Sequence, residues 1–245
     1  VTNVDYILSR GKNRISQEIY DKVISVRKYF EPFENMVTIF DIPENPTGIN
    51  KTIYQRILAN GEIQYKEIDI GGEKRKIFDK YIPHDPSLYY IVIIDHIALM
   101  HTERGFNTKD NIDKMSQYLV QLRKNFGIIP VVVQQLNYDI NDPARVKIGR
   151  LTPLLSDFGD SKYTTRDAQI VLSLFSPFSF NLSTFSGYDT ARLKDRFRSL
   201  EILKARNGGI GNRFGLFYLG ECGYFEELKK ADEMSVMDYE KLIKM

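Results

Sequence analysis

YYIVIID, residues 89–95, is a run of apolar and aromatic residues that ends in an aspartate. A run without polar alternation is typical of a parallel strand that is buried on both faces. A second run, IIPVVV at residues 128–133, ends in two glutamines. Between the runs, apolar residues recur every three or four positions from Thr108 to Phe126, which predicts an amphipathic helix that ends at Gly127. Strand, helix and strand together predict a crossover unit of a parallel sheet.

The residues before this unit predict helices, a short strand and a hairpin. Ser16 is a suitable N-cap for a helix that we expect to end before Pro32. Glycines 71 and 72 join two runs that alternate polar and apolar residues, which is a strong hairpin signal and indicates a solvent-facing insertion. The predicted elements are a buried strand at Met36–Phe40, a helix at about Asn50–Ala59, and hairpin strands at Glu62–Ile70 and Glu73–Tyr81.

The residues after this unit predict a long loop and further strands. Tyr138–Thr165 is polar and lacks periodicity, and loops of such length inside a domain are usually functional. The predicted strands are Gln169–Phe175, Arg198–Arg206 and Arg213–Leu219, and a short helix is expected within Met234–Met245.

The charge and cysteine content set limits on function. The 245 residues include 34 lysines and arginines and 32 aspartates and glutamates, a formal net charge of +2 at pH 7. This balance does not require a nucleic-acid partner, so any DNA contact must come from local basic loops. The single cysteine, Cys222, cannot form an internal disulfide or a thiolate zinc site, which indicates a reducing compartment. The sequence has no signal-peptide pattern and no apolar run of about 18 residues, so we expect no membrane partner.

Polar side chains follow both central strands, where ligands bind in open parallel sheets. Asp95 follows the first run, and Gln134 and Gln135 follow the second. An acid after a buried strand is the Walker B pattern, in which the carboxylate holds Mg²⁺ beside nucleotide phosphates. Many buried strands also end in an aspartate that only caps the next turn, so the pattern alone leaves both interpretations open.

Four segments narrow this choice when they are read in order. They are IVIIDHIALM (91–100), IPVVVQQLN (129–137), LLSDFGDSKYTTRDAQIVLSL (154–174) and LEILKARNGGIGNRFGLFY (200–218). Together they resemble the C-terminal motor domain of DnaB-type replicative DNA helicases. The divergence and the insertions favour a phage or mobile-element member of that family.

The resemblance implies an α/β fold, a RecA-like P-loop NTPase core with a mainly parallel central sheet and antiparallel late strands. It covers nearly the whole chain except the hairpin at about 62–81, an excursion at 176–196 and a tail at about 224–245, so we expect a single motor domain over 1–245. The phosphate-binding pattern G-x-x-x-x-G-K-[ST] does not occur in these residues. We therefore expect that the sequence is N-terminally incomplete or that the natural motor is split or degenerate, and that this chain alone is inactive.

The resemblance also assigns roles at the nucleotide. Asp95 would hold the Mg²⁺ network of ATP or another NTP, and Gln135 would be the sensor that links the γ-phosphate to DNA. Lys204 and Arg206 lie two apart on a predicted strand, so their side chains share a face. In the family this pair reaches the nucleotide of the neighbouring subunit. The alternatives are a strand-end amide for Gln135 and a solubilising charged edge strand for the two cations.

Two loops are expected to contact single-stranded DNA with little sequence preference. The first carries Arg104 and Lys109, and the second carries Arg145, Lys147, Arg150 and Asp160. Any one exposed cation is also explained as a solvated surface charge. The Arg-Glu pair of the family's DNA loop corresponds to Gly159 and Asp160 here, and the serine before the sensor glutamine corresponds to Gln134.

The function implied by the resemblance is an ATP-dependent replicative helicase. It would form a homo-oligomer, a hexameric ring with nucleotide between subunits, and work with a primase or a loader in the cytoplasm of a bacterial host. Two alternatives remain: another RecA-like ATPase such as a recombinase or loader, and a non-catalytic RecA-like module that binds DNA or completes an assembly.

Overall fold

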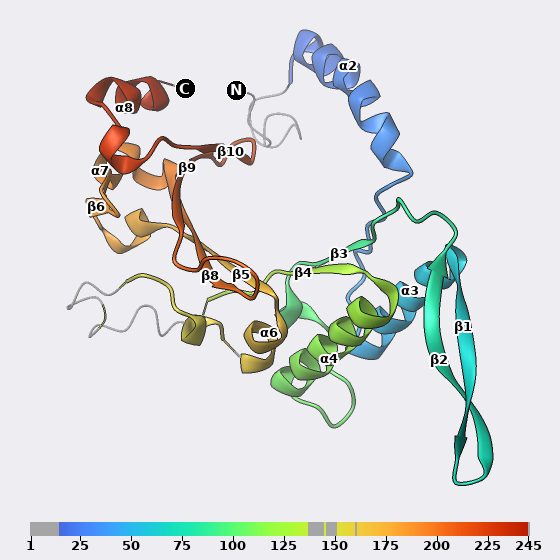
Figure 1. Cartoon of the computed structure of the whole chain (residues 1–245). Coiled ribbons are helices and arrows are strands. Elements are labelled where there is room, and N and C mark those ends of the chain that lie inside the picture. Colours follow the sequence, from blue (N-terminus) through green and yellow to red (C-terminus); the bar gives the residue numbers. More distant parts are fainter. Residues whose placement is uncertain (1–14, 137–144, 146–150, 160, 245) are drawn as a thin grey trace. The chain divides into compact units, whose positions relative to one another are not determined.

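The computed structural model of the chain describes residues 15–136, 145, 151–159 and 161–244. The chain is a mixed α/β protein that divides into two compact units (Figure 1). The β3–β4 unit comprises Ile42–Arg145 and Thr152–Gln169. The β8–β9 unit comprises Val1–Asp41, Val146–Leu151 and Ile170–Met245. In the described part of the chain, none of the helices has the length and apolar character needed to cross a membrane.

Two parallel strands give the β3–β4 unit its name. Strand β3 (Ile91–Ile94) pairs with β4 (Ile129–Val132) in register from Ile91↔Ile129 to Ile94↔Val132. The parallel crossover predicted from the sequence is therefore confirmed. Helix α4 (Thr108–Phe126) connects the strands over the predicted span, because a capping box at its start and the left-handed Gly127 at its end fix both boundaries.

The predicted burial of these strands on both faces is wrong for the described structure. Val92, Ile94 and Val132 pack against the core, whereas Ile91 is 60% exposed and Ile93 is 66% exposed. Successive side chains point to opposite faces of a strand, and the core covers only one of them. The core residues of this unit come from α3 (Pro46–Ala59), η1 (Ile97–Leu99), α4 and the residue before β4. They are Ile57, Ile97, Ile112, Met115, Leu119, Leu122 and Ile128.

Helix α3 (Pro46–Ala59) begins four residues earlier than predicted. The Asn45 side chain accepts a hydrogen bond from the backbone N–H of Gly48 at 2.8 Å, and Pro46 occupies the first turn. Asparagine followed by proline is an N-cap and N1 pair, so the helix begins before the predicted Asn50.

The predicted hairpin insertion is confirmed. Strands β1 (Gly61–Ile70) and β2 (Glu73–Pro83) pair antiparallel, and their tip extends away from α3 and α4 (Figure 1). Gly71 and Gly72 have φ angles of 65° and 89°. A two-residue turn with positive φ at both positions matches the twist of a hairpin, and glycine adopts it without strain.

The β8–β9 unit contains an antiparallel sheet in the order β10-β9-β8-β5. Its strands are β5 (Ile170–Phe175), β8 (Phe197–Ala205), β9 (Arg213–Leu219) and β10 (Tyr224–Glu227). The antiparallel late strands are thus confirmed, but β5 pairs with β8, so the mainly parallel sheet is confirmed only for β3 and β4. The core residues of this unit are Tyr188, Leu193, Phe197, Phe217, Leu219, Leu228 and Tyr239.

The helix and strand expected at the start of the chain need correction. Helix α2 (Gln17–Glu34) has the predicted N-cap, Ser16, but continues through Pro32 to complete its last turn. A proline removes only one backbone donor, so it need not end a helix this close to the terminus. The strand predicted at Met36–Phe40 is absent from the described structure, and Met36 is 77% exposed.

The remaining elements are short, except for the C-terminal helix α8 (Val236–Ile243), which was predicted. They are η1 (Ile97–Leu99), η3 (Leu155–Asp157), α6 (Lys162–Asp167), η4 (Pro177–Phe180), β6 (Thr184–Phe185), β7 (Tyr188–Asp189), α7 (Thr190–Leu193), η5 (Lys194–Arg196) and η6 (Ala231–Glu233).

Candidate functional site

Asp95 and the two glutamines lie at the same end of the β3–β4 pair. Asp95 directly follows β3, and Gln134 and Gln135 lie two and three residues beyond the end of β4. Val133 connects them, because its N–H donates to the carbonyl of Ile94 at 2.9 Å and its carbonyl accepts from the N–H of Ile97 at 3.1 Å. The backbone on both sides of Asp95 is therefore hydrogen-bonded to the residue that precedes Gln134.

The Asp95 carboxylate fits one ligand of a water-coordinated Mg²⁺. The side chain is exposed, and within the described part of the chain it makes no hydrogen bond or ion pair. The described residues hold no group of three or more His, Cys, Asp or Glu side chains that could bind a metal by themselves. Mg²⁺ commonly keeps several waters and takes one or two carboxylates together with substrate phosphates, so a single free carboxylate suits it.

The two glutamines differ in what their side chains contact. The Gln134 amide nitrogen donates to the carbonyl of Gly159 at 2.5 Å, and its amide oxygen accepts from the hydroxyl of Thr164 at 2.7 Å. Gln135 is exposed, and its side chain makes no hydrogen bond to other described residues. The sensor role predicted for Gln135 remains a prediction, whereas the contacts of Gln134 were missed by the sequence analysis.

Glu103 holds the loop after Asp95 against the start of α3 and against α4. Its carboxylate accepts from the backbone N–H and hydroxyl of Thr47 at 3.0 and 2.6 Å and pairs with Lys114 at 2.5 Å. The backbone N–H of Glu103 also donates to the side-chain oxygen of Asn111 at 3.1 Å. The hydrogen bonds from Lys114 and Thr47 hold the pKa of Glu103 below its usual value. This places Arg104, a predicted DNA contact, on a firmly held loop with its own side chain exposed.

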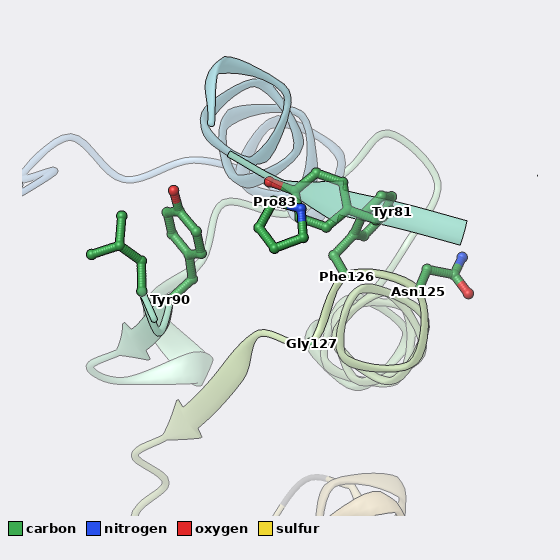
Figure 2. A pocket seen from close by; sticks show the side chains of 7 residues that line it. Tyr81, Pro83, Tyr90, Asn125, Phe126 and Gly127 are labelled. Carbon is green, nitrogen blue, oxygen red and sulfur yellow. The ribbon is translucent and has the colours of Figure 1, made fainter. Parts of the chain in front are cut away.

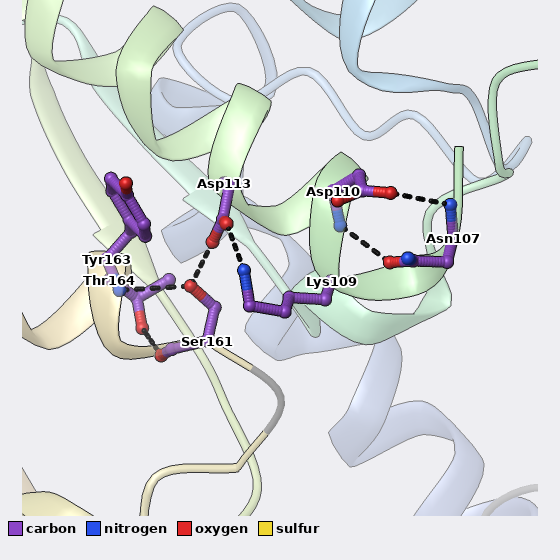
Figure 3. Close-up of polar contacts among 7 residues, drawn as sticks. All are labelled: Asn107, Lys109, Asp110, Asp113, Ser161, Tyr163 and Thr164. Carbon is purple, nitrogen blue, oxygen red and sulfur yellow. Dashed lines mark hydrogen bonds and ion pairs between the residues drawn. The ribbon is translucent and has the colours of Figure 1, made fainter. Parts of the chain in front are cut away.

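Lys109, the second predicted DNA contact, lies in the first turn of α4 and not in the loop, and it is already paired. Its ammonium lies 2.7 Å from the Asp113 carboxylate and 5.8 Å from the centre of the Tyr163 ring. The hydrogen bond to Asp113 raises the pKa of Lys109. The Ser161 hydroxyl donates to the other oxygen of Asp113 and accepts from the Tyr163 N–H at 2.9 Å (Figure 3). A phosphate would therefore compete with Asp113 for this cation.

Arg145 is also engaged within the chain. Its guanidinium makes a bidentate pair with Asp157, with nitrogen-to-oxygen distances of 2.6 and 3.0 Å, and donates to the carbonyl of Thr152 at 3.1 Å. Asp157 is buried and accepts from the backbone N–H of Leu154 at 2.7 Å. Arg145 thus stabilises the turn at η3, and its predicted contact with DNA remains a prediction.

The remaining predicted residues fall into two groups. Lys147, Arg150 and Asp160 lie outside the described residues. Lys204 is half-buried in β8 opposite Val171, and Arg206 is exposed one residue beyond the end of β8. The strand ends at Ala205, before Arg206. The alternation of side chains along a strand therefore does not place Lys204 and Arg206 on one face.

A pocket of about 270 Å³ lies at the opposite end of the parallel strands from Asp95. Tyr90 precedes β3 and Gly127 lies two residues before β4, and Tyr81, Pro83 and Phe126 complete much of the wall (Figure 2). The Tyr81 hydroxyl donates to the Ile57 carbonyl at 2.9 Å, and burial raises the pKa of Tyr81. The pocket lies between the base of the hairpin and the end of α4, and none of the predicted site residues lines it.

Comparison with known proteins gives a family and a fold. A family model described as DnaB-like helicase C terminal domain matches residues 51–227. One solved structure, described as an ATPase domain, matches with a TM-score of 0.54 and 18% identity over 76% of this chain and 52% of that chain. No curated protein matches the sequence.

A second solved structure matches to a similar degree. It is "The Structure Of A DnaB-Like Replicative Helicase And Its Interactions With Primase", with a TM-score of 0.56 and 18% identity over 78% of this chain and 38% of that chain. At 18% identity, both matches show a shared fold alone. The chain spans about half or less of each matched structure.

Proposed function

Because the chain belongs to the family of DnaB-like helicase C-terminal domains, we propose that it is part of the motor of a replicative DNA helicase. The motor would use NTP hydrolysis to translocate on single-stranded DNA and separate a duplex. The observation that carries this proposal is the free Asp95 carboxylate at the end of β3, with two glutamines at the end of the parallel neighbour β4. Ligands of open parallel sheets bind at this edge.

The predicted nucleotide-site residues have different chemical tasks in the proposal. Asp95 would orient the water shell of Mg²⁺, and the ion, when bound with nucleotide, would neutralise charge on the phosphates. Gln135, exposed next to Gln134, would respond to the γ-phosphate. Lys204 and Arg206 would supply positive charge to the transferring phosphoryl group of a neighbouring subunit. Phosphoryl transfer depends mainly on such positioning and charge stabilisation, so no covalent role is needed for any of them.

The proposed assembly is a homo-oligomeric ring, a hexamer, around single-stranded DNA. Arg104 is the best-supported DNA contact, because it is exposed on a loop that Glu103 fastens to α3 and α4. The second loop, with Arg145, Lys147, Arg150 and Asp160, would contribute further contacts. Association with a primase or a loader, and a place in the bacterial cytoplasm, are part of the same proposal.

The test uses the full natural polypeptide that contains these residues. We expect it to hydrolyse ATP with Mg²⁺, to be stimulated by oligothymidylate, and to unwind a forked duplex. Asp95→Asn should leave the circular dichroism spectrum and the thermal midpoint unchanged but remove metal-dependent hydrolysis, because one anionic ligand is lost. Asp41→Asn, which alters an exposed aspartate, is the matched control.

Two outcomes would contradict the proposal. A folded wild-type polypeptide that binds oligothymidylate without any hydrolysis would favour a non-catalytic RecA-like module. Near-normal turnover of Asp95→Asn at ordinary Mg²⁺ would reduce Asp95 to a structural turn cap.

A further inference from the structure

The side chain of Gln134 bridges the end of β4 and a segment that lies 25 to 30 residues further along the chain. Its contacts are the Gly159 carbonyl at 2.5 Å and the Thr164 hydroxyl at 2.7 Å. A carbonyl can only accept, so the amide nitrogen must face Gly159 and the amide oxygen must face Thr164. Both ends of the amide are therefore used, and a serine at this position would be too short to make both contacts.

The same segment has a second attachment. The Ser161 hydroxyl donates to Asp113 in α4 and also caps the start of α6 by accepting from the Tyr163 N–H (Figure 3). Asp113 is held in turn by Lys109 at 2.7 Å. Gly159 and Ser161–Thr164 are thus fixed both to the end of β4 and to the helix that follows the Arg104 loop.

Gln134 is also one residue from the backbone that flanks Asp95. Val133 accepts from Ile97 and donates to Ile94, the residues on either side of the Asp95–His96 step. A change in the position of Asp95 on nucleotide binding therefore has a short, hydrogen-bonded route to Gly159 and Thr164. Gln135 has no comparable contact with the described residues.

We infer that Gln134 is a positioning residue that couples the Asp95 edge to the segment at Gly159 and Ser161–Thr164, so that nucleotide at this edge changes the affinity for single-stranded DNA. This inference rests on the proposed function. It assigns the link to Gln134, whose side chain reaches the segment, in addition to any direct response of Gln135 to the phosphate.

The experiment measures the affinity of the full natural polypeptide for a labelled oligothymidylate with and without a non-hydrolysable ATP analogue. For the wild type we expect the analogue to change the affinity by a factor on the order of 5 to 150, the usual range for coupled sites. Gln134→Ala removes both contacts and should bring this factor close to one. Thr164→Val keeps the contact with Gly159 and should lower the factor in part, and it should have no further effect when combined with Gln134→Ala.

Thr184→Val is the matched control, because Thr184 is an exposed threonine of β6 whose side chain makes no hydrogen bond to other described residues. It should keep the wild-type factor. Thr164→Val is nearly isosteric, so it keeps the test valid if Gln134→Ala lowers the thermal midpoint. Hydrolysis without DNA should be unchanged in Thr164→Val, which a general loss of structure would not allow.

The outcomes separate the two proposals. A wild type with DNA-stimulated hydrolysis, together with variants that keep the full factor, would overturn the role of Gln134 and leave the proposed function intact. A folded wild type without hydrolysis and without any effect of the analogue on DNA affinity would overturn both.

Discussion

The carboxylate of Glu103 lies 2.5 Å from the ammonium of Lys114, and its other oxygen accepts two hydrogen bonds from Thr47. The Glu103 and Lys114 side chains are only 15% and 27% exposed. Three segments meet here: the start of α3, the loop after Asp95 and the middle of α4. The position of Arg104 therefore depends on a partly shielded ion pair that solvent screens less than a surface pair.

Glu103→Gln should destabilise the protein in a pH-dependent way. The pKa of Glu103 is lowered from 4.5 in the folded protein, so its contribution is present above the unfolded pKa and is lost as the pH falls through the lower folded value. We expect a loss of about 1 kcal/mol in the free energy of unfolding at neutral pH. The stabilities of wild type and variant from denaturant titrations should begin to converge as the pH falls below 4.5. Glu62→Gln on the exposed hairpin is the control and should have little effect on stability. A loss of stability by Glu103→Gln that is as large at acidic pH as at neutral pH would contradict the assignment.

Arg104 and Lys109 should contribute unequally to DNA binding. Arg104 is exposed, whereas Lys109 must leave Asp113 before it can pair with a phosphate. Removing one phosphate contact to a single strand should lower the slope of log affinity against log salt by about 0.7. We expect this change for Arg104→Ala and a smaller one for Lys109→Ala, measured with oligothymidylate at several salt concentrations. An equal or larger effect of Lys109→Ala would show that the Asp113 pair does not compete with DNA.

Two methionines offer a matched test of the β3–β4 unit. Met115 in α4 is fully buried, and Met237 in α8 is 79% exposed. Met115→Ala should cost about 2–5 kcal/mol in the free energy of unfolding of that unit, because it removes transfer energy and leaves a cavity. Met237→Ala should change stability by less than about 0.5 kcal/mol. Equal losses in hydrogen-exchange protection of α4 for the two variants would contradict the assigned core.

Local signals determined how much of the fold was predictable. Helix α4 was predicted at its observed bounds because its apolar spacing is regular and Gly127 ends it. The hairpin was predicted from two adjacent glycines whose positive φ angles suit the turn. The predicted end of α2 was wrong because Pro32 was expected to end the helix, and the predicted start of α3 was wrong because Asn45 and Pro46 were not recognised as an N-cap and first-turn pair. Proline is tolerated in a first turn, and here also near a helix end.

Most contacts between residues far apart in the chain could not be predicted from the sequence. The run at residues 89–95 does form a parallel strand, but the one-sided burial of Ile91 and Ile93 depends on which elements pack against it. Asp95 and the glutamines were correctly expected at one edge, since parallel strands share their carboxyl ends. The Gln134 bridge was missed, because nothing local to an amide indicates a partner 25 or 30 residues away. Helix α6 was missed because it is one short turn inside a polar segment.

The most direct test of a motor that shares nucleotide between subunits is the ATPase rate of mixed assemblies. Asp95→Asn and Arg206→Ala should each be inactive alone in the full natural polypeptide, with Arg206→Ala still binding nucleotide. Mixed rings would contain some interfaces with one intact Asp95 and one intact Arg206. Loss of a cation that acts in trans can cost roughly 10³- to 10⁵-fold in rate, so even a minority of restored interfaces should be visible. We predict that the mixture hydrolyses ATP well above either variant; a mixture no more active than its components, despite demonstrated subunit exchange, would contradict the shared site.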